Sequence, residues 1–109
     1  MNVRAYLWQR ATAALMVPLL LVHLALIFYA GTKGLTASDI LARTRGSIGW
    51  AVFYSTFVAI ASIHASIGLR NVLAEWTGMG SATRNLAAWA FGIALAMLGA
   101  RAVLAVVHP

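Results

Sequence analysis

Three long runs of apolar residues dominate the chain. Residues 11–32 form a run of 22 residues without a formal charge, and residues 46–69 form a run of 24. In the third run, residues 85–107, the only charge is Arg101, close enough to the end for its guanidinium to reach the membrane boundary. A helix of about 20 apolar residues crosses the hydrocarbon core of a bilayer. The pattern therefore predicts an all-α integral membrane protein with three transmembrane helices, at about residues 11–32, 46–70 and 85–107.

The polar segments between these runs are short. Thr36 and Asp39 have the spacing of a capping box and predict a short helix at the membrane surface. Gly78 and Gly80 favour a turn between the second and third runs. Residues 1–9 are amphipathic and are expected to lie along the membrane before the first span begins.

The composition places the whole chain in a bilayer. Of its 109 residues, 62% are hydrophobic, and the mean hydropathy is +0.87. Too few polar residues remain to cover a water-soluble surface, so residues 1–109 are expected to form one membrane domain without a soluble catalytic domain. The chain has no cysteine, which excludes thiolate metal sites and iron–sulfur ligation by its own residues. Histidine remains as the strong ligand for a transition metal.

The charge is strongly basic, with eight Lys and Arg against two acidic residues and a formal net charge of +6. The cations lie along the predicted membrane boundaries, where they suit anionic lipid head groups or cofactor carboxylates. They divide evenly between the two sides, so the positive-inside rule gives no orientation. They do not gather into a patch with exposed aromatic residues, and we therefore expect no nucleic-acid partner.

His64 lies inside the second predicted span, where an ionisable side chain is costly and is usually functional. The residues at helical spacing from it form an aromatic stripe with a gap at Gly68. The stripe contains Phe53, Phe57, Ile60, His64, Gly68, Asn71 and Glu75. The gap leaves room for a large planar group such as a haem. The alternative is a neutral histidine hydrogen-bonded to a neighbouring helix.

His23 lies near the middle of the first span, where an ionisable side chain is also costly and is usually functional. It follows Arg10 by thirteen residues, or about 20 Å of helix, whereas His64 precedes Arg70 by six, or about 9 Å. The two imidazoles should therefore differ in depth by roughly 10 Å, too far to share one iron. If both ligate iron, there are two haems; otherwise His23 is a packing or lipid-facing residue.

Two motifs resemble those of a known family. The second span ends in H-x-x-x-G-x-R followed by an acidic and an aromatic residue, here His64, Gly68, Arg70, Glu75 and Trp76. This pattern resembles the haem-ligand helix of the membrane anchors of succinate dehydrogenase and fumarate reductase. Residues 10–13, Arg-Ala-Thr-Ala, resemble the R-x-S/T-G/A element that begins the first helix of those anchors. The motifs occur in the expected order, and the resemblance covers most of the chain.

The resemblance implies a haem b-binding anchor subunit that passes electrons between an iron–sulfur subunit and a membrane quinone, with no succinate chemistry of its own. It implies axial iron ligation by His64 and, as in two-haem anchors, by His23, with Gly68 leaving space for the haem. Arg70 and Arg10 would pair with haem propionates, since guanidinium groups bind carboxylates bidentately, although each is also an ordinary residue for a membrane boundary. Arg10 is alternatively a contact for the quinone head group.

The quinone site departs from the family pattern. Trp76 occupies the position where many small anchors have a tyrosine that bonds a quinone carbonyl, and an indole N–H can donate but cannot accept. Tyr6 occupies a position where the large anchors often have a serine. Both stay candidates for the quinone site, unless a partner completes it or the quinone binds near the other haem.

The resemblance also implies flavoprotein and iron–sulfur partners, docked on the side of the amino terminus. Bis-histidine ligation needs two imidazoles per iron, so we expect a second three-span anchor that shares two haems in a bundle of about six helices. A ridge of small residues is expected to form part of that contact: Ala88, Gly92, Ala96 and Ala100. Two stacked haems suit a low-potential quinone such as menaquinone.

Two alternatives stay open at this point. One is a small structural or assembly membrane protein, and the other is a haem-binding subunit of another respiratory complex. The full length of the first apolar run, with two more after it, indicates a retained span and not a cleaved signal. The start of the sequence shows no recognisable presequence, which favours a bacterial inner membrane over a mitochondrial one.

Overall fold

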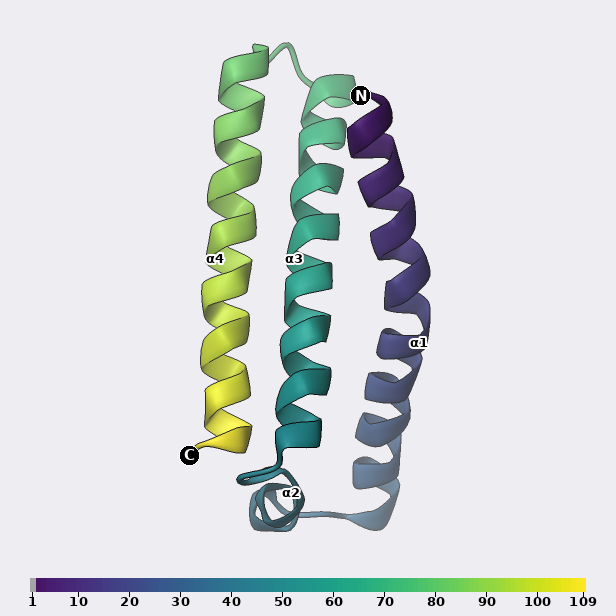
Figure 1. Ribbon diagram of the computed structural model, residues 1–109, viewed down its shortest axis with the longest axis vertical. Helices are drawn as coiled ribbons and strands as arrows, with labels where there is room; N and C mark the ends of the chain where they lie inside the picture. The colour runs from purple at the N-terminus through teal and green to yellow at the C-terminus, as the bar shows by residue number, and fades with distance from the viewer. Residues whose placement is uncertain (1) are drawn as a thin grey trace.

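The computed structural model describes residues 2–109 and contains four helices within them. The helices are α1 (Val3–Lys33), α2 (Ala37–Thr44), α3 (Ile48–Trp76) and α4 (Ser81–Val107). The three long helices run along the 48 Å axis of the molecule, and α2 crosses beneath them (Figure 1). No strand occurs among residues 2–109. Each long helix is apolar and long enough to cross a membrane, so the predicted all-α fold is confirmed.

α1 begins earlier than the apolar pattern indicated. The helix is continuous from Val3, and the Asn2 side chain accepts a hydrogen bond of 2.8 Å from the Ala5 N–H at its start. The expectation that residues 1–9 lie along the membrane surface is therefore wrong for the residues described, while residue 1 lies outside them. The physical reason is that no Gly or Pro interrupts this segment, so the helix propagates through it.

α2 begins with the predicted capping box. The Asp39 N–H donates to Thr36 Oγ1 at 3.2 Å, and the Thr36 N–H donates to Asp39 Oδ2 at 2.9 Å. The backbone hydrogen bond from Thr36, helped by its side chain, lowers the pKa of the Asp39 carboxyl below its ordinary value of 3.8. The predicted short helix is thus confirmed.

The end of α2 is fastened to the end of α4. Thr44 is 1% exposed, and its hydroxyl donates to the Val106 carbonyl at 2.6 Å. The Gly46 N–H donates to the Val107 carbonyl at 2.7 Å. The last carbonyls of a helix have no partner within it, so these two bonds cap α4. We call this part of the bundle the α2 end, and the opposite part, with the amino terminus, the amino-terminal end.

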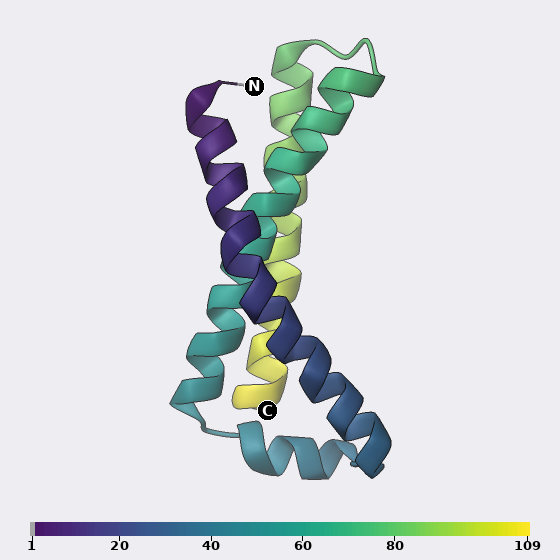
Figure 2. The same ribbon diagram turned by 90° about the vertical axis from the view of Figure 1, so that its right-hand side faces the viewer.

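α3 lies between α1 and α4, and α1 crosses it obliquely (Figure 2). Small residues bring α4 close to α3: a Cβ on Gly92 would lie 3.0 Å from that of Ser66, and one on Gly99 would collide with Val58. The Ser66 hydroxyl also donates to the Ala88 carbonyl at 2.7 Å. Ala88 and Gly92 therefore pack against α3 of the same chain, whereas we had expected this ridge to meet a second subunit.

Few side chains are buried in the bundle. Ala88, 4% exposed, is the one buried hydrophobic residue among residues 2–109, and large apolar side chains point outward along all three long helices. A soluble monomer rarely exposes so much apolar surface. This surface therefore has to meet lipid or other membrane subunits.

Candidate functional site

His64 is joined to α1 through Thr12, near the amino-terminal end. Its Nδ1 lies 3.1 Å from Thr12 Oγ1. Thr12 is 3% exposed, and its Oγ1 also lies 2.8 Å from the Trp8 carbonyl and 3.1 Å from the Gln9 carbonyl. No hydrogen-bond partner of His64 Nε2 occurs within residues 2–109. One ring nitrogen is therefore held by this chain, and the other remains for a ligand.

The gap at Gly68 faces α1 as well. A Cβ on Gly68 would lie 3.4 Å from Gln9 Nε2, so the Gln9 amide lies against the gap. The Gln9 Oε1 is buried without a hydrogen-bond partner in the described part of the chain. The structure thus brings together three residues near the His64 imidazole, and we call the four residues the His64 site: Gln9, Thr12, His64 and Gly68.

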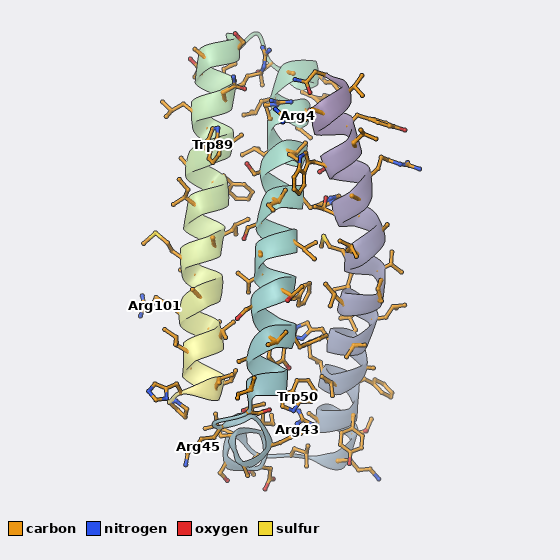
Figure 3. The ribbon with its side chains drawn as sticks, in the orientation of Figure 1. Arg4, Arg43, Arg45, Trp50, Trp89 and Arg101 are labelled. Atoms are coloured by element: carbon orange, nitrogen blue, oxygen red, sulfur yellow. The ribbon has the colours of Figure 1, made fainter. Side chains whose placement is uncertain are left out.

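Arg70 lies on a different side of α3 from the imidazole. It lines a groove of about 660 Å³ between α3 and α4, together with Trp8, Asn85 and Trp89. Six residues of α-helix turn through about 240° net, which explains why Arg70 and His64 do not share a face. The structure therefore does not place the Arg70 guanidinium against His64. Trp89 lies in the half of α4 nearer the amino-terminal end (Figure 3).

The other predicted residues of the amino-terminal end are exposed. The Arg10 guanidinium carbon lies 6.0 Å from the centre of the Tyr6 ring, and Tyr6 is 48% exposed. Trp76, 80% exposed, is the last residue of α3. Both quinone candidates thus lie at the same end of the bundle, on α1 and on α3 (Figure 1).

His23 lies against α3 in aromatic surroundings. Its ring centre is 5.3 Å from that of Phe57 and 6.0 Å from that of Tyr54, both in edge-on arrangements. Its Nδ1 is buried without a hydrogen-bond partner in residues 2–109. The ring lines a cavity of about 310 Å³. The other lining residues are Tyr54, Phe57, Val58, Gly99, Ala102, Val103 and Val106.

The two histidines are well separated along the bundle. Thr12 marks the depth of His64 on α1, and His23 follows it by eleven residues, or about 16 Å of helix. On α3, His64 follows Phe57, the neighbour of His23, by seven residues, or about 10 Å. The α3 spacing equals the predicted difference of roughly 10 Å and the α1 spacing exceeds it, and both place the two imidazoles too far apart for one iron.

Thr12 and Gln9 were missed as site residues by the sequence analysis. Thr12 carried a signal, since it is the S/T position of the motif at residues 10–13, but no role followed from the motif alone. Gln9 carried none. In the described part of the chain, no three His, Cys, Asp or Glu side chains lie close enough to hold a metal ion between them.

Comparison with known proteins adds the family. The family model of the succinate dehydrogenase and fumarate reductase transmembrane subunit matches residues 2–106. No curated protein and no solved structure gives a significant match. The match covers α1 to α3 and α4 up to residue 106, including both motifs at the amino-terminal end. The chain therefore belongs to the family of succinate dehydrogenase and fumarate reductase transmembrane subunits, multi-pass membrane proteins that associate with the flavoprotein and iron–sulfur subunits of that complex.

Proposed function

We propose that this chain is a haem b-binding anchor that passes electrons between the iron–sulfur subunit and a membrane quinone. The observation that carries the proposal is the His64 site, where a membrane-helix imidazole has one nitrogen held by a buried hydroxyl and the other without a partner. A neutral imidazole ligates iron through its unprotonated ring nitrogen. When bound, haem iron supplies one-electron redox chemistry.

The residues at both depths suit such a cofactor. His64 would be an axial ligand of one haem and His23, whose Nδ1 is buried without a partner, an axial ligand of a second. Each iron would need one further imidazole, which supports a second three-span anchor as partner. Two haems at different depths divide the path across the bilayer into short electron transfers, which suits menaquinone.

Charged and polar side chains at the amino-terminal end would bind the haem propionates and the quinone head group. Arg10 would reach a propionate from the exposed side of α1, and Arg70 would do so from the α3–α4 groove. Tyr6 and Trp76 would offer hydrogen-bond donors to a quinone at the same end, where the iron–sulfur subunit would dock. Family membership favours this function over the two alternatives, a structural or assembly protein and a subunit of another complex.

The test is a reduced-minus-oxidised spectrum of the complex purified with its native partners. We expect a b-type signal, quinone reduction with succinate, and the loss of one haem on His64→Ala, because alanine suits a membrane helix and deletes only the ligand. His108→Ala is the matched control, since His108 lies after the last helix and should leave the spectrum unchanged. Unchanged haem content and potential in the His64 variant would refute the assignment.

A further inference from the structure

We infer that Thr12 is a positioning residue that accepts a hydrogen bond from the Nδ1–H of His64 and so commits Nε2 to the haem iron. The inference rests on the proposed function and adds to it the tautomer of the ligand and the residue that selects it. The first observation is burial: Thr12 is one of three buried polar residues among residues 2–109, and it lies within the α1–α3 contact.

The hydrogen-bond distances around the Thr12 hydroxyl favour one direction of the contact. Thr12 Oγ1 lies within bonding distance of two carbonyls of its own helix, at 2.8 and 3.1 Å, and of His64 Nδ1 at 3.1 Å. Carbonyl oxygens can only accept, and a hydroxyl has one proton, which goes to the nearer carbonyl, that of Trp8. The hydroxyl then presents a lone pair to the imidazole.

A lone pair at 3.1 Å is favourable only if Nδ1 carries the proton. A bare Nδ1 would instead require the hydroxyl to turn its proton away from the 2.8 Å bond with the Trp8 carbonyl and towards the longer 3.1 Å contact with the ring. In the neutral ring, a proton on Nδ1 leaves Nε2 bare, and Nε2 has no partner within residues 2–109. The bare nitrogen is the one that ligates a metal, so the contact selects Nε2.

The contact also fixes the ring and tunes its basicity. Thr12 is β-branched, so its side chain has few rotamers in a helix, and the bond to the preceding turn restrains it further. A hydrogen-bond acceptor at the Nδ1–H of an imidazole ligand increases electron donation from Nε2 to the iron. This donation stabilises ferric iron and lowers the midpoint potential of the haem. Thr12 is therefore expected to lower the midpoint potential of the haem at His64.

Three variants test this in the assembled complex. Thr12→Val keeps the branched shape and removes the hydroxyl, and we expect an upward shift of the midpoint potential and changed g values of the ferric haem in electron paramagnetic resonance. Thr12→Ser restores the hydroxyl and should return the midpoint potential and the g values towards those of the wild-type complex. Thr32→Val is the matched control, because the Thr32 hydroxyl donates to the Tyr29 carbonyl of its own helix, at 3.0 Å, and lies twenty residues along α1 from Thr12.

The outcomes separate this inference from the proposed function. If a haem depends on His64 but Thr12→Val leaves its potential and g values unchanged, Thr12 is not a positioning residue although the function stands. A serine variant that shifts as far as the valine variant would also overturn the inference, because the effect would then come from packing. If no haem depends on His64, the proposed function itself fails.

A measurement without any variant covers the case in which Thr12→Val does not assemble. The chain has three histidines, so ¹⁵N labelling of histidine in this chain alone gives a small set of ring signals, measured with the haem in its reduced, diamagnetic state. We expect the ring of the iron-bound His64 to carry its proton on Nδ1. A proton on Nε2, with iron on Nδ1, would overturn the inference directly.

Discussion

His64 and His23 lie on the same helix pair in contrasting surroundings. His64 meets a buried hydroxyl and an amide side chain from α1. His23 meets two aromatic ring edges from α3, and its Nδ1 has no hydrogen-bond partner within residues 2–109. The difference indicates that this chain orients the first imidazole by itself, whereas the second depends on what fills the cavity beside it.

The neighbouring residues explain the difference. Near His64 the α1–α3 contact contains small or polar residues, namely Thr12 on α1 and Gly68 on α3, so a hydrogen bond can span the two helices. Near the α2 end the ring of Trp50 stacks on Tyr54, and the Arg43 guanidinium carbon lies 4.9 Å from the Trp50 ring centre (Figure 3). Aromatic packing holds His23 by shape, and within residues 2–109 no hydrogen bond to its Nδ1 selects a tautomer.

Gly68→Leu should break the His64 site while leaving the surroundings of His23 intact. A Cβ at this position already contacts Gln9 Nε2 at 3.4 Å, so the rest of a leucine side chain has to displace the Gln9 amide from the gap or separate α1 from α3. Overpacking of this kind costs about 1–3 kcal/mol, and we expect the haem at His64 to be lost or its spectrum broadened. Haem content and thermal stability of the purified complex measure the effect.

Gly31→Leu is the matched control for that prediction. Gly31 lies in α1, has ordinary helical φ, and has no atom within 4 Å of its Cβ position. The control should retain both haems and the stability of the unvaried complex. Equal losses in the two variants would show that the gap at Gly68 has no special part in the His64 site.

Acidification should produce the smallest effect, confined to the α2 end. The native pKa of Asp39 is lowered, so its ionised form adds stability above the ordinary value of 3.8, and this contribution disappears as pH falls through the lower native value. Asp39→Asn should remove that pH dependence. Helix content against pH measures it, and a changed haem spectrum at His64 would contradict the independence of the two regions.

Much of the fold could be predicted from the sequence because membrane helices reveal themselves locally. Apolar run length predicted three spans, and the Thr36–Asp39 spacing predicted the start of α2. The stripe containing His64 and Gly68 does face a neighbouring helix, α1. The start of α1 was predicted wrongly. Apolar content shows which part of a helix can cross a bilayer, but the helix itself can begin several residues earlier.

The site was less predictable because its contacts join distant segments. The Thr12–His64 bond spans 52 positions of sequence, and no periodicity indicates which residue of α1 faces the imidazole. The ridge at Ala88 and Gly92 predicted a close helix neighbour correctly but did not say that the neighbour was α3. The separation of Arg70 from His64 could have been predicted from helical spacing. Two residues six positions apart do not lie on the same face of a helix.

Counting haem tests the central claim, that His64 and His23 serve different haems, most directly. A pyridine haemochrome assay against protein should give two haems per purified complex, one after His64→Ala and one after His23→Ala. The two single variants should retain haems of different potential, because the two surroundings differ. One haem per unvaried complex, unchanged by His23→Ala, would reduce His23 to a packing residue and contradict the two-haem account.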